Sequence, residues 1–135
     1  MDRTQLLRLL PHQGPALWLD ALLDHDAARI RGLSDWSHLD KLSEQASPCL
    51  LFEAAAQLCA AHGALYGDGK SIRGASIAKL SALHLHASPT ARRGPLDLQA
   101  DLDSQGAGGA LYRFAIHHAG APLLDGRLLL VLDHA

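Results

Sequence analysis

The feature that most constrains this chain is a long segment, residues 47–66, with the composition of a helix. Ser47 is a good N-cap, and Pro48 suits the first helical position, where a missing N–H costs nothing. Alanine and leucine, both strong helix formers, dominate the interior. Gly67 and Gly69 follow as stop signals. The sequence therefore predicts one long helix here.

This helix is unusually poor in charge. From Pro48 to Ala61 its only charged residue is Glu53 and its only amide is Gln57. A helix on a protein surface carries a charged stripe, so we expect the rest of the chain to wrap around this one. Glu53 and Gln57 are four residues apart and share a face. A carboxylate on so apolar a helix lies either at a partly open edge or in a functional site.

The remaining segments are short and separated by turn signals. Residues 96–103 alternate between apolar and polar, which is the period of a half-exposed strand. The predicted elements are a short helix over 4–10, strands over 16–24 and 28–36, an irregular polar stretch over 37–46, the long helix, and strands over 72–86 (with a kink or bulge), 96–103, 111–118 and 123–132. A sheet that curls around one apolar helix buries it best. We therefore expect one α+β domain over residues 1–135, with a single curved antiparallel sheet.

Composition excludes several classes of protein. The formal net charge of -2 provides no basic field, so we expect no nucleic-acid partner. No run of about 18 apolar residues indicates a membrane span, and no signal peptide is recognised at the N-terminus. Cys49 and Cys59 lie ten residues apart on one predicted helix, too far to form a disulfide. We expect a cytoplasmic protein, with no cofactor and no metal.

Three motifs resemble a known family. Residues 9–20, Leu-Leu-Pro-His-Gln-Gly-Pro-Ala-Leu-Trp-Leu-Asp, are similar to the opening motif of the hot-dog-fold 3-hydroxyacyl-ACP dehydratases. Residues 48–57, Pro-Cys-Leu-Leu-Phe-Glu-Ala-Ala-Ala-Gln, resemble their central-helix motif, and residues 92–98 resemble a later basic turn. The match runs in the right order over nearly the whole chain. The sequence also resembles divergent dehydratase-like proteins of aryl-polyene pigment clusters.

The resemblance implies a fold, a substrate and a reaction. It implies the hot-dog fold, a homo- or heterodimer of hot-dog subunits, and a 3-hydroxyacyl thioester on an acyl carrier protein, as in fatty acid or polyene biosynthesis. In the family a histidine removes the C2 proton, and a carboxylate on the central helix of the partner subunit protonates the departing hydroxyl. Backbone N–H groups at the helix start polarise the thioester carbonyl.

The family residues transfer unevenly to this sequence. Glu53 falls on the catalytic carboxylate, and Gln57 falls on a neighbouring glutamine that we assign to substrate binding. The family segment Gly-His-Phe-Pro-Gly is missing, and its histidine falls on Leu39, which makes the adjacent His38 the candidate base. The helix-start glycine falls on Pro48, which has no N–H, so Cys49 is the nearest residue able to donate one to the substrate.

Other interpretations stay open for these and other residues. Glu53 can instead form a structural hydrogen bond, and His38 can be an ordinary surface histidine. His84 and His86, two apart on a strand, have the spacing of a metal-chelating pair, although a histidine-rich chain makes this a weak signal. Arg92 and Arg93 either attract an acidic carrier protein or lie in a solvated turn.

Two other functions compete with dehydration. The first is a non-catalytic hot-dog subunit that binds acyl-ACP beside an active partner. The second is a hot-dog acyl thioesterase, in which the helix carboxylate activates water. The position of His38 relative to Glu53 separates these possibilities, because a dehydratase needs both groups at one substrate.

Overall fold

The computed structural model describes residues 1–10, 16–67, 72–89, 91–106 and 108–134, with the side chains of 72–75 and 132–134 excepted. Its helices and strands, in chain order, are α1 (Arg3–Leu9), β1 (Ala21–His25), β2 (Arg29–Asp35), α2 (Trp36–Asp40), the 3-10 turn η2 (Pro48–Leu51), α3 (Phe52–Tyr66), β3 (Ile72–Leu85), β4 (Pro95–Gly106), β5 (Gly109–His118) and β6 (Ala121–His134).

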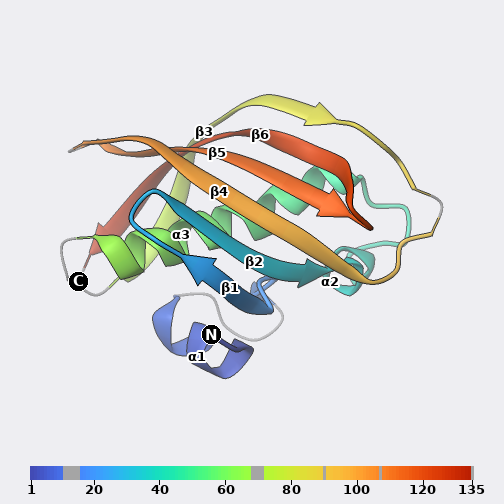
Figure 1. Ribbon diagram of the computed structural model, residues 1–135, viewed down its shortest axis with the longest axis horizontal. Helices are drawn as coiled ribbons and strands as arrows, with labels where there is room; N and C mark the ends of the chain where they lie inside the picture. The colour runs from blue at the N-terminus through green and yellow to red at the C-terminus, as the bar shows by residue number, and fades with distance from the viewer. Residues whose placement is uncertain (11–15, 68–71, 90, 107, 135) are drawn as a thin grey trace.

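The strands form one six-stranded sheet in the order β1-β2-β4-β5-β6-β3, and every neighbouring pair is antiparallel. The sheet curves over α3, which lies along its concave face (Figure 1). This arrangement confirms the predicted α+β fold with a single curved antiparallel sheet around the long helix. Strands β1 and β3 form the two edges of the sheet.

Helix α3 is buried, as its lack of charged residues predicts. Its residues from Ala54 to His62 are all buried, and they pack against the inward-facing side chains of the sheet. The segment Pro48–Tyr66 is long and apolar enough to span a membrane by length and composition alone, with a mean hydropathy of 1.2. Because 56% of that apolar stretch is buried inside the protein, its hydropathy reflects its place in the core.

The sequence predictions differ from the structure in four places. The first helix begins at Arg3 rather than at residue 4, and the Asp2 carboxylate caps it by accepting from the backbone N–H of Gln5. The stretch 37–46, predicted to be irregular, contains most of α2. The first turn of the long helix is 3-10 rather than α-helical. Residues 16–20, predicted as the start of a strand, lie before β1, and distant side chains bind their backbone.

Strand β3 has the irregularity that its sequence predicts. Its pairing with β6 shifts register at three points, the last between Ser81 and His84. Within that shift Ala82 adopts a positive φ of 51°, a conformation that residues other than glycine seldom adopt. The bulge changes which face of the sheet the following side chains occupy.

Candidate functional site

Glu53 lies in the first turn of α3 and is partly buried. Its carboxylate makes no hydrogen bond or ion pair with any other residue that the structure describes. The N-terminal end of a helix favours a negative charge, because the backbone N–H groups there point toward it. Glu53 is therefore an acidic group that the fold positions on the core helix without binding it to another of the described side chains.

Gln57, one turn further along α3, forms hydrogen bonds within the chain through both its amide oxygen and its amide nitrogen. Its Oε1 accepts from the backbone N–H groups of Trp18 and Leu19 at 2.7 and 3.2 Å, and its Nε2 donates to the carbonyl of Ala16 at 2.8 Å. The side chain is only 2% exposed. The glutamine that we assigned to substrate binding thus holds the segment 16–19 against the core helix.

His38 lies on α2 and is only 7% exposed. Its Nε2 donates to Oδ1 of Asp20 at 2.8 Å, and the same oxygen accepts from Arg3 at 3.1 Å. The imidazole stacks on the Trp18 ring, with 6.4 Å between centroids. Its Nδ1 is buried and has no hydrogen-bond partner in the described part of the chain. Neither ring nitrogen is exposed to a substrate in this arrangement.

The start of the long helix offers few free N–H groups. The Oγ of Ser47 accepts from the backbone N–H of Cys49 at 3.2 Å, and the Ser47 carbonyl accepts from Leu50 at 3.0 Å. Pro48 has no N–H. The N–H of Cys49, which we expected to polarise a thioester, therefore already has an intramolecular acceptor.

Trp18 connects these residues, and sequence reasoning missed it. Its backbone N–H is bound by Gln57, its ring stacks on His38, and its carbonyl accepts from Oγ of Ser34 at 2.6 Å. Asp20, two residues later, completes the network. Both residues fall within the family-like motif over 9–20, so the motif identified the segment but not its contacts. We call Trp18, Asp20, Ser34, His38 and Gln57 the Trp18 network.

Helix α2 also anchors the connection between β3 and β4. The guanidinium of Arg92 lies over the Trp36 ring, 5.4 Å from its centroid, and 3.6 Å from the carboxylate of Asp40. The Arg92 side chain is only 20% exposed, so it is neither a solvated turn residue nor a free docking cation. His118 also packs edge-on against Trp36, and it donates from Nε2 to the carbonyl of Arg93 at 2.9 Å.

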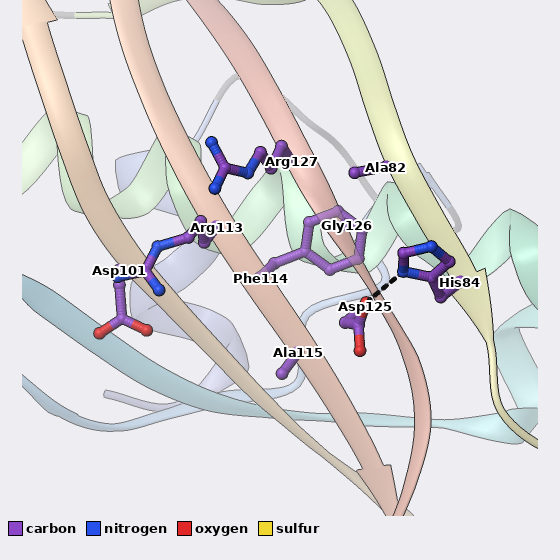
Figure 2. Close-up of a pocket in the computed structure, with 9 residues that line it drawn as sticks. All are labelled: Ala82, His84, Asp101, Arg113, Phe114, Ala115, Asp125, Gly126 and Arg127. Carbon is purple, nitrogen blue, oxygen red and sulfur yellow. Dashed lines mark hydrogen bonds and ion pairs between the residues drawn. The ribbon is translucent and has the colours of Figure 1, made fainter.

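A separate pocket of about 350 Å³ lies over strands β3 to β6 (Figure 2). Arg113 lies between the buried Tyr112 and Phe114, so it points away from α3, to the outer face of the sheet. The Arg113 guanidinium binds Asp103 at 2.7 Å. These outward charges are paired across strands, and they lie on the face of the sheet opposite Glu53.

One of the two histidines with metal-chelating spacing, His84, borders this pocket, and both bind Asp125. Nδ1 of His84 lies 3.3 Å from one oxygen of Asp125, and Nε2 of His86 lies 2.5 Å from the other. Within the described residues no group of three or more His, Cys, Asp or Glu side chains is placed to hold a metal ion. The pair instead joins β3 to β6 through one carboxylate.

The far end of α3 carries a buried aromatic cluster. His62 donates from Nε2 to the carbonyl of Asp26 at 2.9 Å, so its Nδ1 accepts from the Tyr112 hydroxyl at 2.8 Å. Burial raises the pKa of Tyr112. His62 is nine residues beyond Glu53, about 13 Å along the helix axis, so this cluster supports the fold rather than the Glu53 region. Cys59, fully buried nearby, has a thiol pKa raised by burial and is not a nucleophile.

Helix α2, η2 and the first turn of α3 lie at one end of the molecule (Figure 1). The fold thus brings the segments carrying His38, Cys49 and Glu53 to the same end of the core helix. Of the four predicted site residues, three are engaged within the chain, and Glu53 has no polar partner among the described residues.

The fold is that of the hot-dog proteins. The chain is similar to the dehydratase heterocomplex ApeI:P from Xenorhabdus doucetiae, with a TM-score of 0.84 and 17% identity over 96% of this chain and 91% of that one. It is also similar to a point mutant of the thioesterase PA1618 from Pseudomonas aeruginosa, with a TM-score of 0.75 and 14% identity over 100% and 96% of the two chains.

A hypothetical thioesterase with coenzyme A from Streptococcus pneumoniae is similar at a TM-score of 0.62, with 11% identity over 84% of each chain. No protein-family model matches the chain, and neither does any curated protein sequence. At these identities the likenesses establish the fold, and they show that proteins named as dehydratases and as thioesterases share it.

Proposed function

We propose that this protein is a subunit of a hot-dog dehydratase that acts on 3-hydroxyacyl thioesters of an acyl carrier protein in fatty acid or polyene biosynthesis. The observation that carries the proposal is Glu53, an ionisable group on the core helix with no partner among the described residues. Burying an unpaired carboxylate is costly, so an acid retained there without a structural contact fits a chemical role. The cytoplasm is the location where this substrate is expected.

In the proposed reaction a base removes the proton from C2 of the acyl chain, and Glu53 donates a proton to the hydroxyl on C3. The C3–O bond breaks, water leaves, and the electron pair of the C2–H bond becomes the C2=C3 double bond. Gln57 and Cys49 shape the thioester site by fixing its walls, since their own polar groups are bound within the chain.

The test pairs turnover with stability. Glu53→Gln should lower dehydration by roughly 10²–10⁴-fold, the usual contribution of a general acid or base, while the melting temperature stays unchanged or rises. Glu44→Gln is the matched control, because Glu44 is the only other glutamate and is exposed. Mass spectrometry of a 3-hydroxyacyl-carrier substrate separates the outcomes.

Loss of water from the acyl group supports dehydration. Release of the free acid instead supports the thioesterase alternative, which the resemblance to named thioesterases favours. Full activity in Glu53→Gln would end the acid hypothesis. Tight binding of the substrate by this chain without any turnover of its own would favour the non-catalytic subunit.

A further inference from the structure

The pocket on the outer face of the sheet has a cationic side. Arg113 on β5 and Arg127 on β6 lie directly opposite each other across the two strands. Like charges in directly opposed positions of a sheet repel each other and lower its stability. Both arginines line the hollow of about 350 Å³, and both side chains are half-exposed. The two guanidinium groups are therefore open to a ligand that arrives from solvent.

The carboxylates on this side do not balance the two arginines. Nε of Arg113 donates to Oδ1 of Asp103 at 2.7 Å, whereas Nη1 of Arg127 lies 3.9 Å from Oδ2, too far for a hydrogen bond. Asp101, which also lines the pocket, accepts from Nε of Arg29 at 2.6 Å. Two arginines thus share one carboxylate, and the Arg127 guanidinium donates no hydrogen bond to any residue that the structure describes.

The other side of the pocket carries a carboxylate held by imidazoles. Figure 2 shows Asp125 and His84 on this side, away from the two guanidinium groups. Oδ1 of Asp125 lies 3.3 Å from Nδ1 of His84, and Oδ2 is bound to His86. Each oxygen of a carboxylate has two lone pairs, so Asp125 can accept a further hydrogen bond. A ligand hydroxyl is the simplest group able to donate it.

Small residues leave the space between the two sides open. Ala115 on β5 and Gly126 on β6 line the hollow, and neither has a side chain long enough to fill it. Ala82 lines it from β3, at the register shift between Ser81 and His84, and has a φ of 51°. Bulges re-aim nearby side chains, and backbone in this sparsely populated region is concentrated at binding and catalytic sites. The bulge and the small residues thus occur together at this hollow.

We propose that this pocket binds a small phosphate monoester, with its phosphate on Arg113 and Arg127 and its hydroxyl-bearing part toward Asp125. Guanidinium groups suit phosphate, because their planar forks donate to two oxygens at once. The negative charge of the phosphate offsets the repulsion between the opposed arginines. The hollow is at the lower end of the range for small-molecule sites, about 300–1,000 Å³, which fits a ligand the size of a sugar phosphate. This site lies on the sheet face opposite Glu53 and is independent of the function proposed above.

Titration followed by backbone amide NMR tests this proposal and needs no turnover. The probes are inorganic phosphate, glucose 6-phosphate and glucose, each compared with sodium chloride at the same ionic strength, because salt alone screens surface charges. Both phosphates should produce saturable shifts in the amide signals of Ala115, Gly126 and Arg127. Glucose 6-phosphate should bind more tightly than inorganic phosphate, because it also reaches Asp125. Glucose and sodium chloride should produce no saturable shift.

Three arginine variants make the result specific. Arg127→Gln should weaken binding of both phosphates by roughly tenfold or more, the loss expected for one charge-assisted hydrogen bond. Arg127→Lys keeps the charge without the planar fork, so its affinity should be intermediate. Arg31→Gln is the matched control, because Arg31 also faces outward from the sheet but is bound to Asp24, outside the pocket. It should change the affinity by less than about twofold, since distant surface charges are screened.

Three results would overturn the proposal. The first is the absence of saturable shifts with either phosphate, or equal affinity in wild type and Arg127→Gln, because the arginines then hold no anion. The second is inorganic phosphate binding at least as tightly as glucose 6-phosphate, because the space toward Asp125 then takes no part. The third is loss of phosphate binding in Glu53→Gln, which would place the anion on the other face of the sheet. If the proposal holds, Glu53→Gln binds both phosphates as wild type does.

Discussion

Replacing Gln57 by Leu should destabilise the protein strongly, because Gln57 holds a segment that has little strand pairing of its own. Its Oε1 is the acceptor for two backbone N–H groups, those of Trp18 and Leu19, and both residues are buried. Leucine fills a similar volume but accepts no hydrogen bond. The carbonyl of Ala16 also loses its donor, but Ala16 is exposed and can bond to water.

The magnitude follows from the two N–H groups. Each buried donor left unsatisfied costs about 1–3 kcal/mol, so Gln57→Leu should lower the free energy of unfolding by about 2–6 kcal/mol. This is a large part of the roughly 5–15 kcal/mol that stabilises a typical domain. The loss should exceed any gain from the added apolar contact of leucine.

Urea unfolding at a fixed protomer concentration measures the effect. Tryptophan fluorescence is a suitable signal, because Trp18 and Trp36 are both buried and become exposed on unfolding. Gln45→Leu is the matched control, since Gln45 is exposed, and it should stay within about 0.5 kcal/mol of wild type. A loss below about 1 kcal/mol in Gln57→Leu would refute the assignment of Gln57 to the Trp18 network and return it to substrate binding.

Three further predictions concern other parts of the fold. Tyr112→Phe removes the donor to Nδ1 of the buried His62 and should cost about 1–3 kcal/mol in urea unfolding; an unchanged midpoint would contradict the contact. Burial alone would raise the pKa of Asp101, but hydrogen bonds, chiefly from Arg29, outweigh it and lower that pKa. The stability from this pair is therefore present above the unfolded-state pKa and is lost as pH falls through the folded-state pKa, so Arg29→Gln should destabilise the protein at neutral pH and match wild type in strong acid. A difference that persists at low pH would place the effect elsewhere. Strand β3, an edge of the sheet, should pair with the corresponding strand of another hot-dog subunit, so sedimentation should show dimers, and a chain that stays monomeric at micromolar concentration in the absence and presence of any partner would argue against this.

The core of the fold could be predicted from the sequence because its signals are local. The Ser47-Pro48 start, the apolar interior of α3 and the alternation along β4 each follow from residues close together in the chain. Because α3 has no charged stripe, it had to be buried, and the strands predicted around it had to form the surrounding sheet. These signals predicted the six strands and their place around one helix.

The missed elements depend on distant or very short patterns. Helix α2 has five residues, too few to show a helical period, although Asp35 caps it by accepting from the backbone N–H of Ser37. Residues 16–19 resemble a strand because they are apolar, but backbone groups of Ala16, Trp18 and Leu19 are bound by the side chains of Gln57 and Ser34. A sequence pattern does not show that the hydrogen-bond partners of a backbone segment are distant side chains rather than a neighbouring strand.

The same dependence on distant contacts explains why the candidate site was only partly predictable. Helical spacing placed Glu53 and Gln57 on one face. It did not show that, among the described residues, Gln57 is hydrogen-bonded and Glu53 is not. The network that holds residues 16–20 uses His38 and Gln57, so substitutions at these positions should first lower stability. Glu53 makes no polar contact within the described chain, so its substitution should leave stability intact. Measured together, stability and turnover therefore separate a residue that builds the hot-dog fold from one that acts on its substrate.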